Sequence, residues 1–160
     1  MKRLANTGGL IQQSVDKVGS HEDWIEDIND ISSTQVRFPI IADSDRGVAW
    51  LYDMLPESAT GSKDMVLTIR SVFVIDPNKK IRLSMTYPAS TGRNSAEVLR
   101  VIDSLQTTDK LGLASPIDWQ VGDDLIVPVP VSTEKAKEKF ADVREVRPYL
   151  RFTSGKGKSS

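Results

Sequence analysis

Cysteine is absent from the 160 residues of this chain, and histidine occurs once, at position 21. Without a thiol the chain can form no disulfide, no thiolate metal site and no thiol nucleophile of its own. A single histidine excludes metal sites built from several histidines. His21 falls in a predicted first helical turn, where we expect a polar side chain to be solvated. The sequence therefore predicts no metal ion and no cofactor.

Long apolar runs and a strong net charge are also absent. No stretch is long and apolar enough to cross a bilayer, and the first residues lack the apolar segment of a secretory signal. The net charge is −1, so no concentrated positive field points to nucleic acid or to an anionic membrane. Glycine-rich phosphate loops and serine-nucleophile motifs are missing, which excludes the common NTPases and hydrolases. We expect a soluble protein without a targeting signal.

What is present is an alternation of helical and extended patterns in the first half of the chain. The predicted elements are a helix over residues 20–31, extended segments over 10–15 and 38–43, a short helix over 47–55 and a loop over 57–64. Ser20 and Asp23 offer a capping pair at the start of the longer helix. Gln12 and Gln13 interrupt the apolar pattern of the first extended segment, which weakens its prediction as a buried strand.

The strongest strand signals lie at residues 66–75 and 80–86, separated by Asp-Pro-Asn-Lys at residues 76–79. Proline presets the second position of a turn and asparagine tolerates left-handed geometry, so we predict a β-hairpin. A helix is predicted to begin at Asn94 or Ser95. The order strand, helix, hairpin, helix matches the second half of a thioredoxin-like α/β fold, although other α+β folds share it.

After residue 106 prolines divide the chain into short segments, with a capped helix predicted over residues 132–140. We interpret this part as a small C-terminal appendage rather than a second core. The predicted division is therefore a core over residues 1–107, an extension over 108–153 and a flexible tail over 154–160.

Two arginines stand out among the charged residues. Arg70 lies in an apolar strand, where a charge is costly unless it is paired or exposed. An outward-facing position is the plain alternative, because Thr68, Arg70 and Val72 share one face of the strand. Arg93 precedes a predicted helix start, where the helix dipole disfavours a cation, so a specific partner would explain it.

Three segments carry a family resemblance: Phe-Pro-Ile-Ile-Ala-Asp at residues 38–43, Arg-Ser-Val-Phe-Val-Ile-Asp-Pro-Asn-Lys-Lys-Ile-Arg-Leu at 70–83, and Tyr-Pro-Ala-Ser-Thr-Gly-Arg-Asn at 87–94. Further matches lie at residues 20–24, 97–106, 116–119 and 148–153. Together they resemble the 1-Cys peroxiredoxins, thiol peroxidases with an extended C-terminal domain. The resemblance is nearly continuous from residue 14 to residue 153 and is most similar to the mitochondrial branch.

The resemblance implies an α/β, thioredoxin-like fold followed by the family's C-terminal extension. It also implies an activity in which a cysteine thiolate attacks a peroxide, becomes a sulfenic acid and is recycled by an external thiol. Arg70 and Arg93 match the family's catalytic arginines, and Trp24 matches an aromatic residue of the substrate pocket. Hydrogen peroxide and organic hydroperoxides would be the substrates, in antioxidant defence and redox homeostasis. A homodimer in mitochondria or cytoplasm is implied as well.

The chain departs from the family because the Pro-x-x-x-Thr-x-x-Cys motif lies upstream of the segments matched here, and no other cysteine replaces it. We therefore expect an incomplete thioredoxin-like fold without its first core strand and helix, and exposed sheet edges on both sides of that strand. Three interpretations stay open. The chain is a catalytically incomplete peroxiredoxin, an interaction module that joins a full-length peroxiredoxin, or a non-functional gene fragment.

Overall fold

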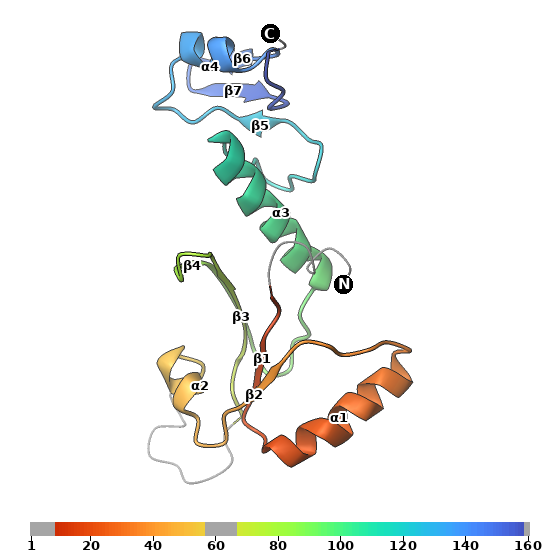
Figure 1. Ribbon diagram of the computed structural model, residues 1–160. Coiled ribbons are helices and arrows are strands. Elements are labelled where there is room, and N and C mark those ends of the chain that lie inside the picture. Colours follow the sequence, from red (N-terminus) through yellow and green to blue (C-terminus); the bar gives the residue numbers. More distant parts are fainter. Residues whose placement is uncertain (1–8, 57–66, 159–160) are drawn as a thin grey trace. The chain divides into compact units, whose positions relative to one another are not determined.

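The computed structural model describes residues 9–56 and 67–158, and the chain forms two compact units, Met1–Arg93 and Asn94–Ser160 (Figure 1). The loop predicted over residues 57–64 lies outside the described residues. The division predicted after residue 107 concerns the family's two domains and stays a prediction. Across the described ranges, none of the helices has both the length and the apolar character needed to cross a membrane.

The first unit begins with a parallel pair of short strands. β1 (Gln12–Ser14) and β2 (Ile40–Ala42) pair along their whole length, with Gln13 opposite Ile41. The helix α1 (Val18–Ile31) lies between them in the chain, as parallel strands require a crossover connection. Figure 1 shows the two strands side by side and α1 extending from the end of β1.

The start of α1 differs from the prediction in two respects. Lys17 is the N-cap residue and Ser20 lies inside the first turn, where its hydroxyl donates to the Lys17 carbonyl at 2.8 Å, so the expectation of a Ser20 cap was wrong. A serine within a turn satisfies its hydroxyl on a preceding carbonyl instead of capping. The expectation that His21 is solvated was also wrong, because His21 is only 6% exposed. It shares the inward face of the helix with Ile25 and Ile28.

A buried carboxylate organises the next turn of the chain. Asp43 is 2% exposed and accepts the Val48 amide at 2.9 Å, the Ala49 amide at 2.7 Å and the Gln13 side-chain amide at 2.8 Å. It thus satisfies the first free amides of α2 (Gly47–Leu51). The polar Gln13, which weakened the prediction of β1, has a partner 30 residues away.

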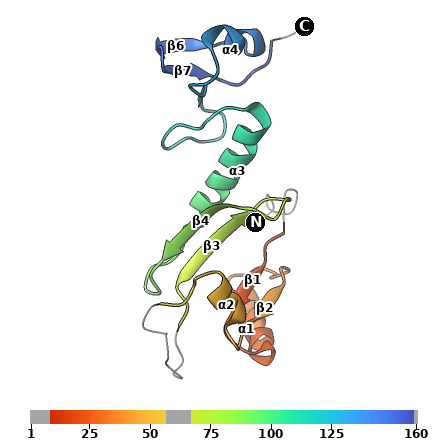
Figure 2. The ribbon, with the colours of Figure 1, turned by 90° about the vertical axis from the view of Figure 1, so that its left-hand side faces the viewer.

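The predicted hairpin is confirmed. β3 (Arg70–Ile75) and β4 (Ile81–Tyr87) are antiparallel, and Figure 2 shows them as a long twisted ribbon. The left-handed residue of the turn is Lys79, with φ of 62°, and not the expected Asn78. In the described part of this unit each sheet has two strands, so β1 and β3 each keep one edge without a strand neighbour.

The second unit begins with the long helix α3 (Ser95–Leu111), which starts where the sequence predicts. The Asn94 side chain accepts the amides of Ala96 and Glu97 at 2.9 and 3.3 Å, a typical N-cap. Gly112 ends the helix with φ of 69°, a left-handed conformation that glycine adopts without strain.

Short strands and one helix complete this unit. They are β5 (Leu125–Ile126), α4 (Thr133–Lys139), β6 (Arg144–Arg147) and β7 (Leu150–Thr153), and the sheet order is β5-β7-β6. Both ribbon views show α4 lying over the β6–β7 pair (Figures 1 and 2). Part of the predicted tail joins this unit, because the Ala141 amide donates to the Lys156 carbonyl at 3.1 Å.

The hydrophobic core of the second unit corrects the interpretation of an appendage without a core. Its buried members are Leu113, Trp119, Leu125, Val127, Ala136 and Phe140. These residues come from a loop, a strand and a helix, so no single segment displays a recognisable apolar face. For this reason the sequence of these proline-punctuated segments did not predict a core.

A buried arginine ties this core to the preceding loop. Arg151 is 3% exposed, and its guanidinium donates to the carbonyls of Val131 and Pro128 at 2.6 and 3.1 Å. A third, longer contact reaches the Thr133 hydroxyl at 3.4 Å. Carbonyls and a hydroxyl neutralise no charge. We therefore infer that Arg151 stabilises the conformation of the loop that carries these acceptors, and does not act as half of an ion pair.

Candidate functional site

Arg70 is the first residue of β3 and lies opposite Tyr87, the last residue of β4. Its side chain is half-buried. Within residues 9–56 and 67–158 it forms no ion pair with a carboxylate. A guanidinium that is partly desolvated without a counter-ion favours a negative ligand, since the charge is otherwise uncompensated. The hairpin register thus fixes this cation at the open end of the hairpin.

Arg93 lies at the far end of the loop that leaves β4 immediately after the cross-strand partner of Arg70. The loop turns at once, because the Thr91 amide donates to the Pro88 carbonyl at 2.9 Å. The chain then reaches Asn94, which caps α3. Arg93 is exposed and has no carboxylate partner in the described part of the chain. The role of Arg93 in a peroxide site remains a prediction.

Trp24 lies in the middle of α1 and is 39% exposed. Its indole nitrogen makes no hydrogen bond that would fix the ring against another described side chain. The hairpin register explains why Arg70 and the start of the Arg93 loop are neighbours. Among the described residues, no hydrogen bond or cation–π contact joins Trp24 to either arginine. Its place in a substrate pocket remains a prediction.

Ionisable groups with shifted pKa values lie in the second unit, where they have structural partners. Hydrogen bonds from Ser154 and Thr153 lower the pKa of Asp142 to about 2. A bidentate contact with Arg100, at 2.6 and 2.8 Å, lowers the pKa of Glu97. Among the described residues, no group of three or more His, Asp or Glu side chains is arranged to hold a metal ion.

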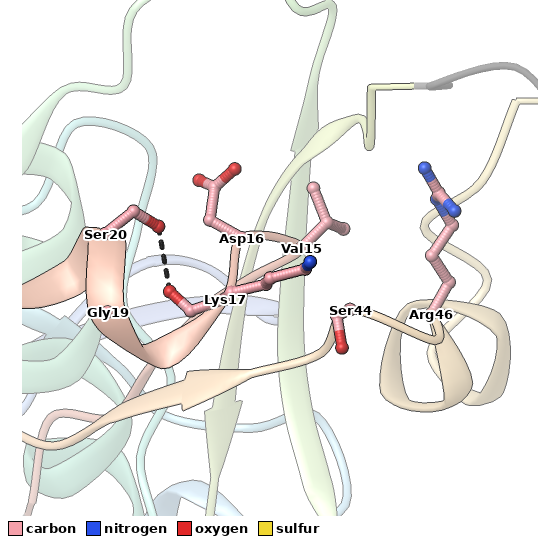
Figure 3. Close-up of a pocket in the computed structure, with 7 residues that line it drawn as sticks. All are labelled: Val15, Asp16, Lys17, Gly19, Ser20, Ser44 and Arg46. Atoms are coloured by element: carbon pink, nitrogen blue, oxygen red, sulfur yellow. Dashed lines mark hydrogen bonds between the residues drawn. The ribbon is translucent and has the colours of Figure 1, made fainter.

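An open hollow of about 580 Å³ lies at the carboxyl ends of β1 and β2 (Figure 3). Its walls come from two loops and the first turn of α1. Its lining residues are Val15, Asp16, Lys17, Gly19, Ser20, Ser44 and Arg46. Sequence reasoning missed this site, because Lys17 and Arg46 are far apart in the chain and only the parallel pairing of β1 and β2 brings their loops to one edge.

Two family models match this chain. The one described as "AhpC/TSA family" matches residues 4–84, and the one described as "C-terminal domain of 1-Cys peroxiredoxin" matches residues 104–142. The two matches are consecutive and leave only short segments outside them. They agree with the order of the two parts expected from the sequence.

Curated relatives extend the similarity over most of the chain. Peroxiredoxin PRX1, mitochondrial, of Saccharomyces cerevisiae is 55% identical over 152 residues, covering 92% of this chain and 58% of the relative. Peroxiredoxin-6 of Gallus gallus is 42% identical, covering 90% of this chain and 69% of the relative. The chain thus spans less than two thirds of the yeast relative's length.

Solved structures agree with the sequence comparisons. A yeast mitochondrial 1-Cys peroxiredoxin, studied for its thiol resolving mechanism via glutathione/thioredoxin systems, superposes with a TM-score of 0.83 and 55% identity, covering 91% of this chain and 70% of that chain. A cysteine-to-serine mutant of Peroxiredoxin 6 from Arenicola marina superposes with a TM-score of 0.85 and 42% identity, covering 95% of this chain and 73% of that one.

Proposed function

Because this chain belongs to the 1-Cys peroxiredoxin family, with its thioredoxin-like fold and C-terminal domain, we propose that it supplies the arginine side of a peroxide-reducing site. The nucleophile of that site is a cysteine, which the present sequence does not contain. The chain alone is therefore inactive towards peroxides. It contributes to turnover when a cysteine-bearing segment of the family is joined to it.

In the proposed reaction the cysteine thiolate attacks one oxygen of hydrogen peroxide or an organic hydroperoxide. A sulfur–oxygen bond forms and the oxygen–oxygen bond breaks, and the departing oxygen takes a proton and leaves as water or an alcohol. Sulfur is oxidised to a sulfenic acid and the peroxide is reduced. One external thiol then condenses with the sulfenic acid and releases water, and a second thiol regenerates the cysteine and leaves as the disulfide.

Arg70 and Arg93 stabilise negative charge on the thiolate and on the peroxide in this scheme. A guanidinium beside the thiol favours the thiolate, and its N–H groups donate to the peroxide oxygen on which negative charge develops. The observation that carries the proposal is the position of Arg70, half-buried at the end of the hairpin and without a carboxylate partner in the described residues. Trp24 would line the pocket beside them.

The test is hydrogen peroxide consumption with excess dithiothreitol, by the chain alone and by a fusion with the cysteine-bearing segment of a 1-Cys peroxiredoxin. We expect turnover from the fusion only. In the fusion, Arg70→Gln lowers kcat/KM by roughly 10²- to 10³-fold, as loss of one preorganised donor does elsewhere. The exposed Arg93 contributes less, and Arg93→Gln costs roughly tenfold.

The matched control is Arg37→Gln, which removes an exposed arginine of the same unit that bonds to Gln35. This variant keeps full turnover. Peroxide consumption by the chain alone would disprove the cysteine argument. A folded but inactive fusion, or an Arg70→Gln fusion with unchanged kcat/KM, would show that the family resemblance records ancestry and not a usable site.

The second candidate function is that of an interaction module. It is favoured by the two-stranded sheets of the first unit, which leave β1 and β3 each with an unpaired edge in the described residues. Such edges bind another strand through main-chain hydrogen bonds. The partner would be a full-length peroxiredoxin or a second copy of this chain, in mitochondria, as the yeast relative's name suggests, or in the cytoplasm. Co-purification with a full-length relative, with the mass of the complex measured by light scattering, would support this candidate over the peroxidase role.

A further inference from the structure

We propose that the thioether of Met85 is a site of selective oxidation by hydrogen peroxide, which converts this side chain to methionine sulfoxide. The chain has no cysteine but contains four methionines, of which Met54 and Met85 lie in the described residues. The inference uses the same guanidinium as the proposed function, that of Arg70. It needs neither the missing cysteine nor an external thiol.

The β3–β4 hairpin places Met85 on the same face as Arg70 (Figure 2). Arg70 lies opposite Tyr87, and Val72 lies opposite Met85. Residues two positions apart on a strand share a face, and so do residues directly opposite each other on paired strands, so Met85 is the diagonal neighbour of Arg70. Diagonal neighbours lie roughly 7–8 Å apart, within reach of long side chains. A peroxide at the Met85 sulfur is therefore within reach of the guanidinium.

This face of β4 is partly shielded from solvent. Met85 and Tyr87 are half-buried, whereas Ser84 and Thr86 on the opposite face are exposed. A sulfur that is half-buried still admits a molecule as small as hydrogen peroxide. Partial desolvation also strengthens the interaction between a guanidinium and a developing negative charge.

The Met85 sulfur already has a polar partner. The Tyr87 hydroxyl donates to it at 3.7 Å. This contact favours one orientation of the flexible thioether and uses one sulfur lone pair, so the second lone pair is left to attack a peroxide. Because thioether sulfur is a weak acceptor and a sulfoxide oxygen is polar, the same hydroxyl stabilises the product better than the reactant.

In the proposed step the sulfur lone pair attacks one oxygen of hydrogen peroxide. A sulfur–oxygen bond forms and the oxygen–oxygen bond breaks. The proton of the attacked oxygen passes to the departing oxygen, which leaves as water. Sulfur is oxidised and the peroxide is reduced. Negative charge develops on the departing oxygen, and the Arg70 N–H groups donate to it.

Met54 provides the internal comparison. It is half-buried like Met85, and its sulfur accepts no hydrogen bond from the described residues. Exposure alone therefore predicts similar oxidation rates for the two side chains. A faster reaction at Met85 would report the donors that surround its sulfur.

The experiment exposes the purified chain to excess hydrogen peroxide and follows the sulfoxide at each methionine by peptide mass spectrometry. We expect Met85 to react about tenfold faster than Met54, the effect of one charge-assisted hydrogen bond to the departing oxygen. Arg70→Gln removes this advantage, and Arg70→Lys retains part of it, because an ammonium still donates. Arg37→Gln, the matched control, retains all of it.

Two controls test the role of the fold. In urea the parent chain should lose the difference between Met54 and Met85, because the hairpin no longer holds Arg70 near the sulfur. An unchanged rate at Met54 in Arg70→Gln shows that the first unit of this variant is still folded. Methionine sulfoxide reductase should restore the thioether.

Equal rates at Met54 and Met85 in the folded chain, or an undiminished Met85 rate in Arg70→Gln, would overturn the proposal. Oxidation of Met85 consumes one peroxide per chain and is not turnover, because dedicated reductases and not the assay thiol reduce a sulfoxide. An active fusion without selective oxidation of Met85 would reject this site and keep the proposed function. Selective oxidation with an inactive fusion would keep the site and reject the peroxidase role.

Discussion

Replacing Arg151 is expected to destabilise the second unit strongly, because this buried guanidinium donates to two carbonyls of the loop before α4. Its bonds to Val131 and Pro128, at 2.6 and 3.1 Å, are hydrogen bonds from a charged donor, each contributing about 1.5–3 kcal/mol. Removing the cation also removes its desolvation cost, which offsets part of the loss. We therefore expect Arg151→Met to lower the free energy of unfolding by about 2–4 kcal/mol.

The lysine variant separates charge from geometry. An ammonium is a point donor and cannot span both carbonyls as the planar guanidinium does, so Arg151→Lys is expected to cost about 1–3 kcal/mol although the charge is unchanged. Arg147→Met is the matched control. Arg147 is exposed on β6, and in the described part of the chain it donates only to the neighbouring Val146 carbonyl, so its loss should change stability by less than about 0.5 kcal/mol.

Urea unfolding followed by tryptophan fluorescence measures these differences. Trp119 is 2% exposed in the core of the second unit, whereas Trp24 and Trp50 are 39% and 75% exposed. Changing the two exposed tryptophans to phenylalanine leaves Trp119 as the reporter. A loss of about 3 kcal/mol moves the midpoint by roughly 1–3 M urea, at the m-value of a small domain. An Arg151→Met midpoint within 0.3 M of the parent (roughly 0.5 kcal/mol) would refute the stabilising role of Arg151.

Two further predictions concern the residues that close the second unit. Asp142→Asn should cost about 1 kcal/mol at pH 7, after allowance for the solvent exposure of this carboxylate. Because the folded pKa is about 2 and the ordinary value is 3.8, the stabilisation is present above pH 3.8 and is lost as the pH falls through 2. Urea midpoints at pH 7, 4 and 2.5 should therefore converge for parent and variant, and a constant gap would contradict the linkage. Gly155→Ala should cost about 1–3 kcal/mol in thermal unfolding, because φ is 75° and the new Cβ would lie 2.7 Å from the Leu111 Cδ1 atom. Gly122→Ala, with φ of 107° but no atom within 4 Å, isolates the backbone part of that cost.

The sequence was sufficient to predict those elements whose boundaries depend on neighbouring residues in the chain. The Asp-Pro-Asn-Lys turn predicted the β3–β4 hairpin, and Asn94 predicted the start of α3, because turn and cap residues act on amides within three positions. The same reasoning failed at Ser20, where the helix had already begun at Val18. A cap signal fixes a helix start only when no earlier residue can adopt helical geometry at lower cost.

The sequence by itself determined the family and the absence of a thiol, since both follow from residue identity and order. Tertiary structure alone decided the burial of His21 and Arg151, the bond from Gln13 to Asp43 and the meeting of Lys17 with Arg46 at one hollow. The physical reason is distance along the chain. Periodicity reports which face of one element is apolar, but desolvation and hydrogen bonding depend on neighbours that only folding brings into contact.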